Sequence, residues 1–494
     1  MARGELAGRT DRAILTGLLL LGLALRVGVA LGLPNIVRGD EIFQTLEPAY
    51  RLVHGVGVVA WEWRLGIRSW LLPGVFAPVI AVAGWLGLGP GFWLGAIAAL
   101  LSAFSLVVVA LGWRFGAAAA GREGAILAAG LGAVWFDLIL FAPKALSETV
   151  GAHVMLIGAW YAWRAGREAD RRAAWLAGVF LGLAFVIRFH LGPALAVAAL
   201  YAARTDWHGR WPALLAGAAL PVAGQAVLDW ASWGAPLQSV WLNLWVNLGE
   251  GRSEFYGTQP FYWYPGRLLL AWGPGLPPGL VLALLGARRL PMLGAMALVH
   301  LAAHSLIAHK EMRFLYPAAM LLPILAGIGA AELLRRLRLS AWVGLAGFAA
   351  LSLLAATGEN YRGNFQRMAG GPLGAALVRA EPELCGLGLL DHGAESRGWW
   401  IWGGGYVHLG RHVPMSLAET PEELPRLAGG YNYALLPRAA LAALPGFETL
   451  RCWPGALWEG GGGHDPDLCV ARRPGTCAAD AAHEINAVLK RQGN

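Results

Sequence analysis

Two adjacent carboxylic acids, Asp40 and Glu41, are the residues best suited to chemistry in the first half of the sequence. They begin a stretch that ends at Pro73, follows a single apolar segment and is rich in Glu, Arg and Trp. A carboxylate held just outside a bilayer can take a proton from a sugar hydroxyl while a second substrate stays dissolved in lipid. We predict that one of the two acids is a general base. Asp40 is the first choice and Glu41 the alternative, because neighbours in an extended loop point in opposite directions.

A second polar cluster, HKEMRFLYP at 309–317, lies between two apolar segments. Lys310 and Arg313 offer charge-assisted hydrogen bonds to phosphate, and a guanidinium can bind two phosphate oxygens at once. The simpler interpretation is a basic loop at the level of the lipid headgroups, in which Glu311 neutralises Arg313. We predict a donor-phosphate site formed by Lys310, Arg313, His309 and Arg188.

A third polar stretch, 229–264, includes the run SEFYGTQPFYWY. A single Tyr or Trp here is most simply an anchor at the membrane interface. Their concentration suggests a sugar platform, in which rings stack on a pyranose and amides bind hydroxyl groups. The predicted substrate-binding residues of all three stretches are Gln44, Glu47, Trp61, Glu62, Arg68, Asp229, Tyr256, Gln259, Trp263 and Glu311.

The three stretches together suit a sugar linked to a lipid phosphate. Its polyprenyl tail would lie in the bilayer and its phosphate would pair with cations, while a hydroxyl group attacks the anomeric carbon from the aqueous side. Basic side chains can stabilise the phosphate leaving group, and no dense acidic ligand set calls for Mg²⁺ or Mn²⁺. We therefore predict no metal and no other cofactor.

The composition indicates an integral membrane protein. Of 494 residues, 57% are hydrophobic and only 14% are charged, and the mean hydropathy is +0.51. Such values lie far from those of soluble globular domains. The net charge of +8 comes from Arg clusters between apolar runs, which is typical of cytoplasmic loops rather than of nucleic-acid binding.

The distribution of Arg predicts the topology. Arg residues before the first span place the N-terminus in the cytoplasm and Asp40 on the opposite side. Residues 70–89 contain Pro73 and Pro78 and are interpreted as a re-entrant or juxtamembrane element, within a long first external loop at 34–91. Eleven spans follow from this choice: 13–33, 92–113, 124–142, 147–164, 173–188, 191–204, 211–232, 266–287, 291–308, 313–334 and 341–357. Charged residues then gather at the external span ends: Asp137, Lys144, Glu148, Arg188, His190, Asp229, His309, Lys310, Glu311 and Arg313.

A polar tail follows the membrane part. The expected domains are 1–357, which spans the membrane, and 358–494, a small soluble α/β domain on the external side. Short β-like runs occur at 387–390, 433–436 and 468–471. All four cysteines lie in this tail, which favours one or two disulfides in an oxidising compartment, with the pairing of Cys385, Cys452, Cys469 and Cys477 left open. A zinc site is the competing interpretation, although no CxxC spacing supports it.

The motifs resemble glycosyltransferase family 22, the GT-C membrane mannosyltransferases of GPI-anchor and N-glycan assembly that use dolichyl-phosphate mannose. The first block is DExxQxLExAxRLVxGxGxxxWEWxxGIRSWLxP at 40–73. The second is Asp229 with FYG at 255–257 and with Pro260 and Trp263, and the third is HKExRFLYP at 309–317. The resemblance covers residues 1 to about 335. It implies a GT-C fold, an inverting mannosyl transfer at the external or lumenal face, Asp40 as the catalytic acid residue of the first loop and no metal.

One position departs from the family: Arg38-Gly39 stands where many members have His-Pro before the acids. This puts the local backbone and part of the substrate pocket in question. The composition, rich in Ala, Gly and Arg, suggests a bacterial plasma-membrane protein with an undecaprenyl- or decaprenyl-phosphate donor; a eukaryotic member would lie in the endoplasmic reticulum. The acceptor is expected to be a glycolipid or glycan whose identity stays open. The alternative function is a transporter or flippase for lipid-linked sugars, but we detect no internal repeat.

Overall fold

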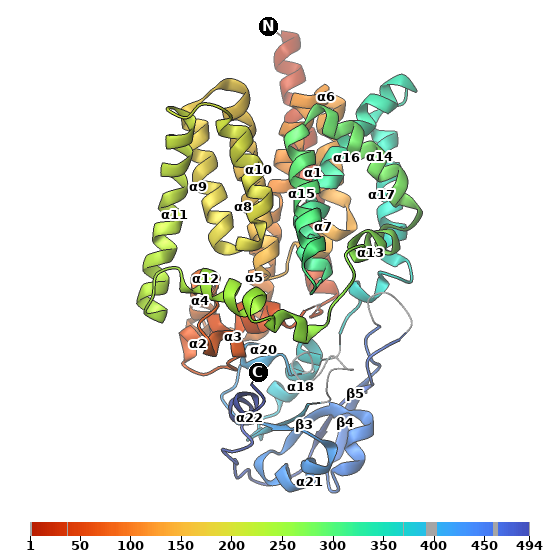
Figure 1. Ribbon diagram of the computed structural model, residues 1–494. Coiled ribbons are helices and arrows are strands. Elements are labelled where there is room, and N and C mark those ends of the chain that lie inside the picture. The colour runs from red at the N-terminus through yellow and green to blue at the C-terminus, as the bar shows by residue number, and fades with distance from the viewer. Residues whose placement is uncertain (1, 37, 369, 392–402, 458–462, 494) are drawn as a thin grey trace. The chain divides into compact units, whose positions relative to one another are not determined.

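The computed structural model describes the chain except for residues 1, 37, 369, 392–402, 458–462 and 494 (Figure 1). The chain forms two compact units. The first contains Met1–Val29, Ser69–Leu71 and Ala98–Gly358, and the second contains Ala30–Arg68, Leu72–Ile97 and Glu359–Asn494. The last change from one unit to the other falls between residues 358 and 359, and most of the first loop belongs to the same unit as the tail.

The first unit is a bundle of helices. Its elements are most of α1 (Ala2–Gly32), the end of α5 (Pro90–Ser105), α6 (Val107–Val134), α7 (Phe136–Phe141), α8 (Ser147–Glu168), α9 (Arg171–Ile187), η2 (Phe189–Leu191), α10 (Gly192–Ala203), α11 (Arg210–Trp233), α12 (Gln238–Leu244), η3 (Trp245–Gly249), η4 (Arg252–Tyr256), α13 (Trp263–Trp272), η5 (Gly273–Gly275), α14 (Leu276–Arg289), α15 (Pro291–Leu306), η6 (Met312–Leu315), α16 (Tyr316–Arg336) and α17 (Ala341–Thr357).

The mainly helical membrane architecture is confirmed. Among the described residues, five helical stretches are long and apolar enough to cross a membrane: Gly8–Gly32, Pro90–Val134, Arg210–Trp233, Trp263–Arg289 and Met312–Arg336. The chain reverses inside the second of these at Gly121, whose φ is 72°, at the connection predicted between spans 92–113 and 124–142. The total of eleven spans stays a prediction.

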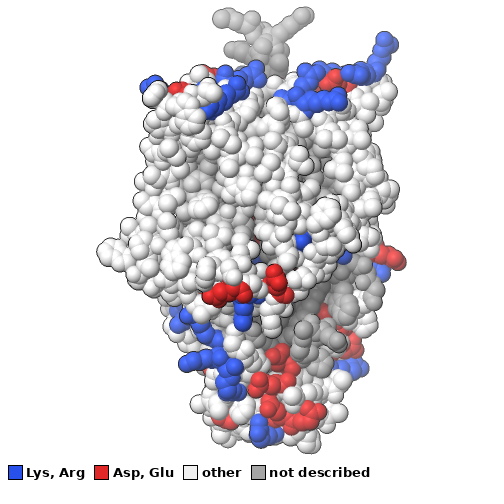
Figure 2. Space-filling model, in the orientation of Figure 1, with Lys and Arg blue, Asp and Glu red and all other residues white. Residues whose placement is uncertain are grey.

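Charged residues separate to the two ends of the bundle helices. Helices α8 and α16 end at Glu168 and Arg336, in basic segments, whereas Glu148 and Arg313 lie at or next to their opposite ends. Helix α9 begins at Arg171 and is followed by Arg188. Figure 2 shows Lys and Arg gathered along one rim of the bundle, beside a broad band with few charges. This arrangement is typical of helices that cross a bilayer.

Small residues allow the bundle helices to pack closely. A Cβ atom added to Gly178 of α9 would lie 2.0 Å from the carbonyl oxygen of Leu214 in α11, and one added to Gly217 of α11 would lie 2.1 Å from that of Trp175 in α9. The two backbones thus touch, as is common between membrane helices. A charged side chain also lies inside the bundle. Arg26 of α1 is fully buried and donates hydrogen bonds to the carbonyl oxygens of Gly132 and Ala133 at the end of α6.

The second unit combines the first loop with the tail. Its elements are the beginning of α5, η1 (Ile42–Leu46), α2 (Glu47–His54), α3 (Trp61–Arg64), α4 (Leu71–Trp85), η7 (Arg362–Asn364), η8 (Gly370–Gly374), α18 (Ala375–Ala380), β1 (Leu387–Leu390), α20 (Gly405–Leu409), β2 (Met415–Ala418), η9 (Pro421–Glu423), α21 (Leu424–Leu427), η10 (Ala428–Gly430), β3 (Tyr433–Pro437), η11 (Arg438–Ala443), β4 (Glu448–Trp453), β5 (Leu468–Arg472) and α22 (Ile485–Arg491). Helix α4 corresponds to the element predicted at 70–89 and has 15 residues, fewer than the ~20 needed to span a bilayer.

The tail is an α/β structure, as predicted. Its five strands form one mixed sheet in the order β2-β1-β3-β5-β4. The central strand β1 is parallel to β2 and β3, whereas β5 is antiparallel to β3 and β4. All three predicted β-like runs are strands, and their side chains are almost entirely buried because helices and loops cover the sheet.

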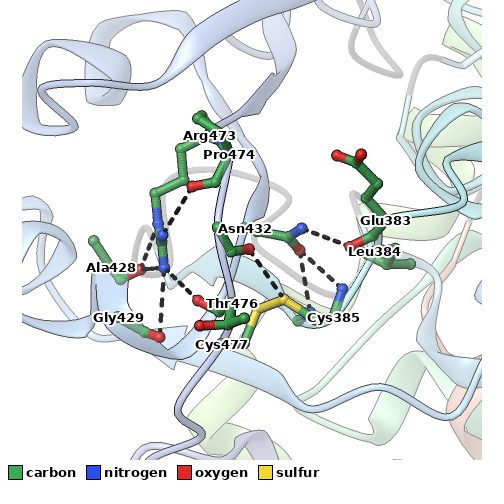
Figure 3. The surroundings of a disulfide bond; sticks show 12 residues. Glu383, Leu384, Cys385, Ala428, Gly429, Asn432, Arg473, Pro474, Thr476 and Cys477 are labelled. Atoms are coloured by element: carbon green, nitrogen blue, oxygen red, sulfur yellow. Dashed lines mark hydrogen bonds between the residues drawn. A yellow bond between two sulfur atoms is a disulfide. The ribbon is translucent and has the colours of Figure 1, made fainter.

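The tail contains two disulfides, one of which lies within the sheet. Cys452 and Cys469 join the paired strands β4 and β5, and Cys385 pairs with Cys477. Figure 3 shows the second bridge beside Asn432, which accepts a hydrogen bond from the backbone N–H of Cys385 and donates one to the carbonyl oxygen of Glu383. The expectation of disulfides is confirmed, and the pairing that the sequence left open is resolved.

Candidate active site

Asp40 lies in the second unit at the start of a helical segment. The backbone N–H groups of Ile42 and Phe43 both donate to the carbonyl oxygen of Gly39, which closes the first helical turn around the acids. The segment continues directly into the π-helix η1, a form that is rare and often found at functional sites. The expectation of an extended loop at Asp40 and Glu41 was wrong, because this turn makes the backbone helical.

The helical backbone explains the partner of Asp40. Residues four apart lie on one face of a helix, and the Gln44 side-chain amide accordingly donates to the Asp40 carboxylate. The same amide donates to Oε1 of Glu62 at 3.1 Å, and that oxygen lies 3.4 Å from Nη2 of Arg68. Four predicted site residues therefore form one connected group.

The two adjacent acids differ in accessibility. The Asp40 side chain is partly exposed, whereas Glu41 is only 6% exposed. Trp61, at the start of α3, is also partly exposed, and its neighbour Trp63 is buried and donates to the carbonyl oxygen of Phe43. This accessibility favours Asp40 as the residue that meets a substrate.

Glu47, predicted to bind substrate, is fully buried. Its Oε1 accepts hydrogen bonds from the backbone N–H groups of Val58 at 2.7 Å and Tyr406 at 3.0 Å, and its Oε2 accepts one from Val407 at 2.8 Å. Burial raises the pKa of Glu47 to about 7, although these hydrogen bonds act in the opposite direction. Its contacts thus join the first loop to α20 of the tail, and a substrate role stays a prediction.

In the first unit, Arg188 and Arg313 share one carboxylate. Oε1 of Glu148 lies 3.0 Å from Nη2 of Arg188 and 3.1 Å from Nη1 of Arg313, and all three side chains are at most 6% exposed. Arg313 is also bound by both oxygens of Glu311, at 3.0 and 2.8 Å. Two of the predicted phosphate-binding residues therefore lie together, held by an acid to which the sequence analysis gave no site role.

The HKEMRF stretch contacts the aromatic stretch of residues 229–264. Nδ1 of His309 lies 2.9 Å from the carbonyl oxygen of Gly257, and Nζ of Lys310 donates to the carbonyl oxygen of Gln259 at 2.9 Å. Burial lowers the pKa of His309, but hydrogen bonds to Glu311 and Gly257 outweigh it, so that the pKa lies above its ordinary value. The contacts of Lys310 and His309 hold the two loops together, and phosphate binding by these residues stays a prediction.

The remaining predicted residues divide into exposed and buried ones. Tyr256 and Gln259 are exposed and Trp263 is partly exposed, so their side chains are accessible to a ligand. Asp229 is fully buried. Its oxygens accept hydrogen bonds from the N–H and hydroxyl of Ser239 at 2.9 and 2.7 Å and from the Gln225 amide at 2.7 Å. These contacts fix the beginning of α12, and a direct role in substrate binding stays a prediction.

The fold places the protein in a known structural class. Crystal structures of ArnT from Cupriavidus metallidurans match it with a TM-score of 0.54 in the form bound to undecaprenyl phosphate and 0.56 in the apo state. The matches cover 97% and 95% of this chain and 100% and 98% of ArnT, at 14% and 15% sequence identity. The protein therefore has the GT-C fold of membrane glycosyltransferases.

The sequence defines the family within that class. Residues 18–366 match the Alg9-like mannosyltransferase family, and the chain belongs to this family. The resemblance stated from the motifs is thus confirmed. GPI mannosyltransferase 3 of Yarrowia lipolytica is 30% identical over 326 residues, and GPI alpha-1,2-mannosyltransferase 3 of Danio rerio is 28% identical over 312 residues. These matches cover 64% and 60% of this chain and 62% and 55% of the relatives, so the chain spans less than two thirds of their length.

Proposed function

We propose that the protein is an inverting mannosyltransferase that moves mannose from a polyprenyl-phosphate donor to a hydroxyl group of a glycolipid or glycan. Membership of the Alg9-like mannosyltransferase family is the observation that carries the proposal. The paired arginines at Glu148 and the accessible Asp40 supply the two functions that such a transfer needs.

Each group has one step in the proposed reaction. The acceptor hydroxyl oxygen attacks the anomeric carbon from the face opposite the phosphate, and the Asp40 carboxylate takes its proton. The bond from the anomeric carbon to the phosphate oxygen breaks, and the polyprenyl phosphate leaves with an additional negative charge. Arg188 and Arg313 stabilise this charge as it develops. ArnT, which shares the fold, binds undecaprenyl phosphate, a lipid of the class proposed as the donor carrier.

The proposed site lies on the non-cytoplasmic side of the membrane. The basic ends of α8, α14 and α16 favour the cytoplasm by the positive-inside rule. Glu148 and Arg313 lie at or next to the opposite ends of α8 and α16. Two disulfides in the tail are consistent with an oxidising compartment, where such bonds persist. We propose the plasma membrane of a bacterium as the location, with the tail also on the non-cytoplasmic side.

The function is tested by adding purified protein to liposomes with polyprenyl-phosphate mannose carrying a radioactive sugar. The acceptor is supplied as glycolipid extracted from cells that lack this protein. We expect one labelled mannose to enter a glycolipid whose sugar chain is shortened in those cells. Transfer from a nucleotide sugar instead, or movement of the donor across the bilayer without transfer, would contradict the proposal.

Donor recognition is tested separately with Lys310→Ala and Arg313→Ala. Because both residues are proposed to bind the donor phosphate, we expect the KM for the donor to rise by about tenfold or more, as for loss of a charge-assisted hydrogen bond. The KM for the acceptor should change much less, and both constants are measured in the same liposomes. Unchanged dependence on donor concentration in both variants would refute the phosphate site.

A further inference from the structure

One helical segment of the first unit has an unusual distribution of apolar residues. Helix α12 continues into the π-helix η3, so that residues 238–249 form one helical segment, QSVWLNLWVNLG, without a charged residue. Trp241, Leu244, Trp245 and Leu248 are 50%, 38%, 60% and 53% exposed. Their spacing of i, i+3, i+4 and i+7 places them along one face of the helix.

The opposite face carries the polar side chains and packs against the protein. Ser239 and Asn243 are buried, with exposures of 6% and 3%, as are Val240 and Val246, at 8% and 6%. The buried side chains are thus both polar and apolar, and the largest apolar side chains of the segment are exposed, whereas a surface helix of a soluble protein turns its apolar face inward. An exposed row of two Trp and two Leu side chains would be unfavourable in water, since apolar surface of this kind normally marks a contact with membrane or protein.

The orientation of the segment is fixed from within the bundle. Helix α11 ends at Gly234, whose φ is 89°, and the chain turns before α12 begins. Asp229, one turn before the end of α11, accepts hydrogen bonds from both the N–H and the hydroxyl of Ser239. Its other oxygen accepts from Gln225, whose own amide oxygen accepts from the Ser69 hydroxyl at 2.9 Å. Figure 1 shows the yellow-green segment that begins at α12 running across the ends of the bundle helices rather than along them.

The exposed face continues the surface that the bundle presents to lipid. Val227 and Trp230, in the last turns of the apolar helix α11, are 62% and 65% exposed. The indole N–H of Trp245 donates to Oε1 of Glu250 at 2.8 Å, so the polar edge of this ring has a partner while its apolar body stays exposed. Rings with one apolar and one polar side favour the boundary between acyl chains and headgroups.

We propose that residues 238–249 form an interfacial anchor, which lies in the plane of the membrane with Trp241, Leu244, Trp245 and Leu248 inserted among the acyl chains. The occupant of the exposed face is the lipid bilayer, because the face is uncharged and joins the lipid-facing surface of α11. Asp229 is then a positioning residue that sets the direction of the anchor relative to α11. The proposal concerns a membrane contact and does not depend on the proposed enzymatic function.

The proposal is tested with fluorescent labels on single introduced cysteines. The four native cysteines are paired in disulfides, so a thiol-reactive dye attaches at the new position. Trp245→Cys and Leu248→Cys report on the exposed face, Val227→Cys is the control for acyl chains, and Glu422→Cys, on the exposed part of the tail, is the control for water. Each protein is placed in lipid nanodiscs, and quenching by brominated phospholipids and by aqueous iodide is compared.

We expect the labels at 245 and 248 to be quenched by brominated phospholipids about as strongly as the label at 227, and by iodide several-fold less than the label at 422. Quenching by iodide to the level of position 422 would overturn the proposal, because the face would then lie in water. Protection from both quenchers would also overturn it and would indicate a protein partner or a second copy of the chain. The two reporter positions guard against a variant that fails to fold.

Discussion

At the scale of single residues, the Asp40 side chain reaches solvent while being oriented by Gln44. A general base needs both properties, since it must approach the hydroxyl proton within hydrogen-bonding distance in a defined orientation. Glu41 is buried and therefore does not meet the requirement of access to the hydroxyl group. The choice of Asp40 over Glu41 therefore rests on the difference in exposure between these two adjacent side chains.

We predict that Asp40→Asn lowers the rate of mannosyl transfer by ~10²–10⁴-fold, because the amide cannot take the proton. Glu41→Gln should lower it by less than about tenfold, since Glu41 is not the base. Transfer is measured in the liposome assay, after the melting temperature of each variant has been shown to match that of the wild type. Full activity of Asp40→Asn would remove Asp40 from the role of base.

Glu148 is the residue whose role depends most on its buried surroundings. Its Oε1 contacts the guanidinium groups of Arg188 and Arg313 at once. Glu332 provides an exposed counterpart, because it also pairs with two arginines, Arg289 at 2.9 Å and Arg336 at 2.8 Å, but is about one-third exposed. The two acids make the same kind of contact in different environments.

We predict that Glu148→Ala lowers the free energy of unfolding by about 3–5 kcal/mol, because it removes the buried carboxylate that contacts both buried guanidinium groups. Glu332→Ala should change it by at most about 1 kcal/mol, since water screens exposed ion pairs. Denaturant unfolding of both variants in one detergent gives the comparison. Equal effects would show that burial does not govern the Glu148 pair.

At the scale of secondary-structure elements, direct backbone contact between α9 and α11 fixes the position of Arg188 at the end of α9 and of Asp229 near the end of α11. Gly217 of α11 faces this contact, whereas for Gly224 of the same helix a Cβ atom would meet no atom within 4 Å. The two glycines therefore differ in packing while sharing one helix.

We predict that Gly217→Ala lowers the free energy of unfolding by about 1–3 kcal/mol, because the added methyl group forces the helices apart. Gly224→Ala should be neutral or slightly stabilising, since alanine has the higher helix propensity. Thermal unfolding in detergent is the measurement. A loss of stability of the same size in both variants would contradict the prediction, because the close contact at Gly217 would then not be the cause of the loss.

At the scale of the whole molecule, the first loop folds with the tail although more than 260 residues separate them in the chain. The Glu47 carboxylate joins these two parts by accepting hydrogen bonds from the backbone N–H groups of Val58, Tyr406 and Val407. Trp93 adds a hydrogen bond to the carbonyl oxygen of Val407 at 3.0 Å. The loop that carries Asp40 is thus supported by the disulfide-linked domain, so damage to the tail is expected to affect the candidate site.

We predict that Glu47→Gln lowers the free energy of unfolding by about 1–3 kcal/mol, because the side-chain NH₂ group cannot accept a backbone hydrogen bond. The wild-type effect depends on pH. The pKa of Glu47 in the folded protein, about 7, lies above its ordinary value of 4.5. The contribution of protonated Glu47 to the free energy of unfolding is therefore complete below pH 4.5 and is lost as the pH rises through the folded-state pKa.

The stability difference between wild type and Glu47→Gln should therefore shrink as the pH is raised from about 4.5 to about 7. Denaturant titrations at several pH values measure this difference, with the exposed Glu422→Gln as the control. If the stability difference between the two proteins grew with pH, the pKa of Glu47 would be lowered rather than raised on folding, which would contradict the prediction.

The sequence by itself determined the membrane class, the family, the three strands predicted in the tail and the presence of disulfides. These features depend on local composition, on periodicity and on motifs that can be read along the chain. Only the tertiary structure decided the helical backbone at Asp40, the pairing of the cysteines and the contacts of Glu47, Glu148 and Asp229. The disulfide pairing and the contacts of Glu47 and Glu148 depend on groups brought together by folding: Glu148 contacts an arginine that is 165 positions further along the chain, and no pattern within either segment specifies that distance.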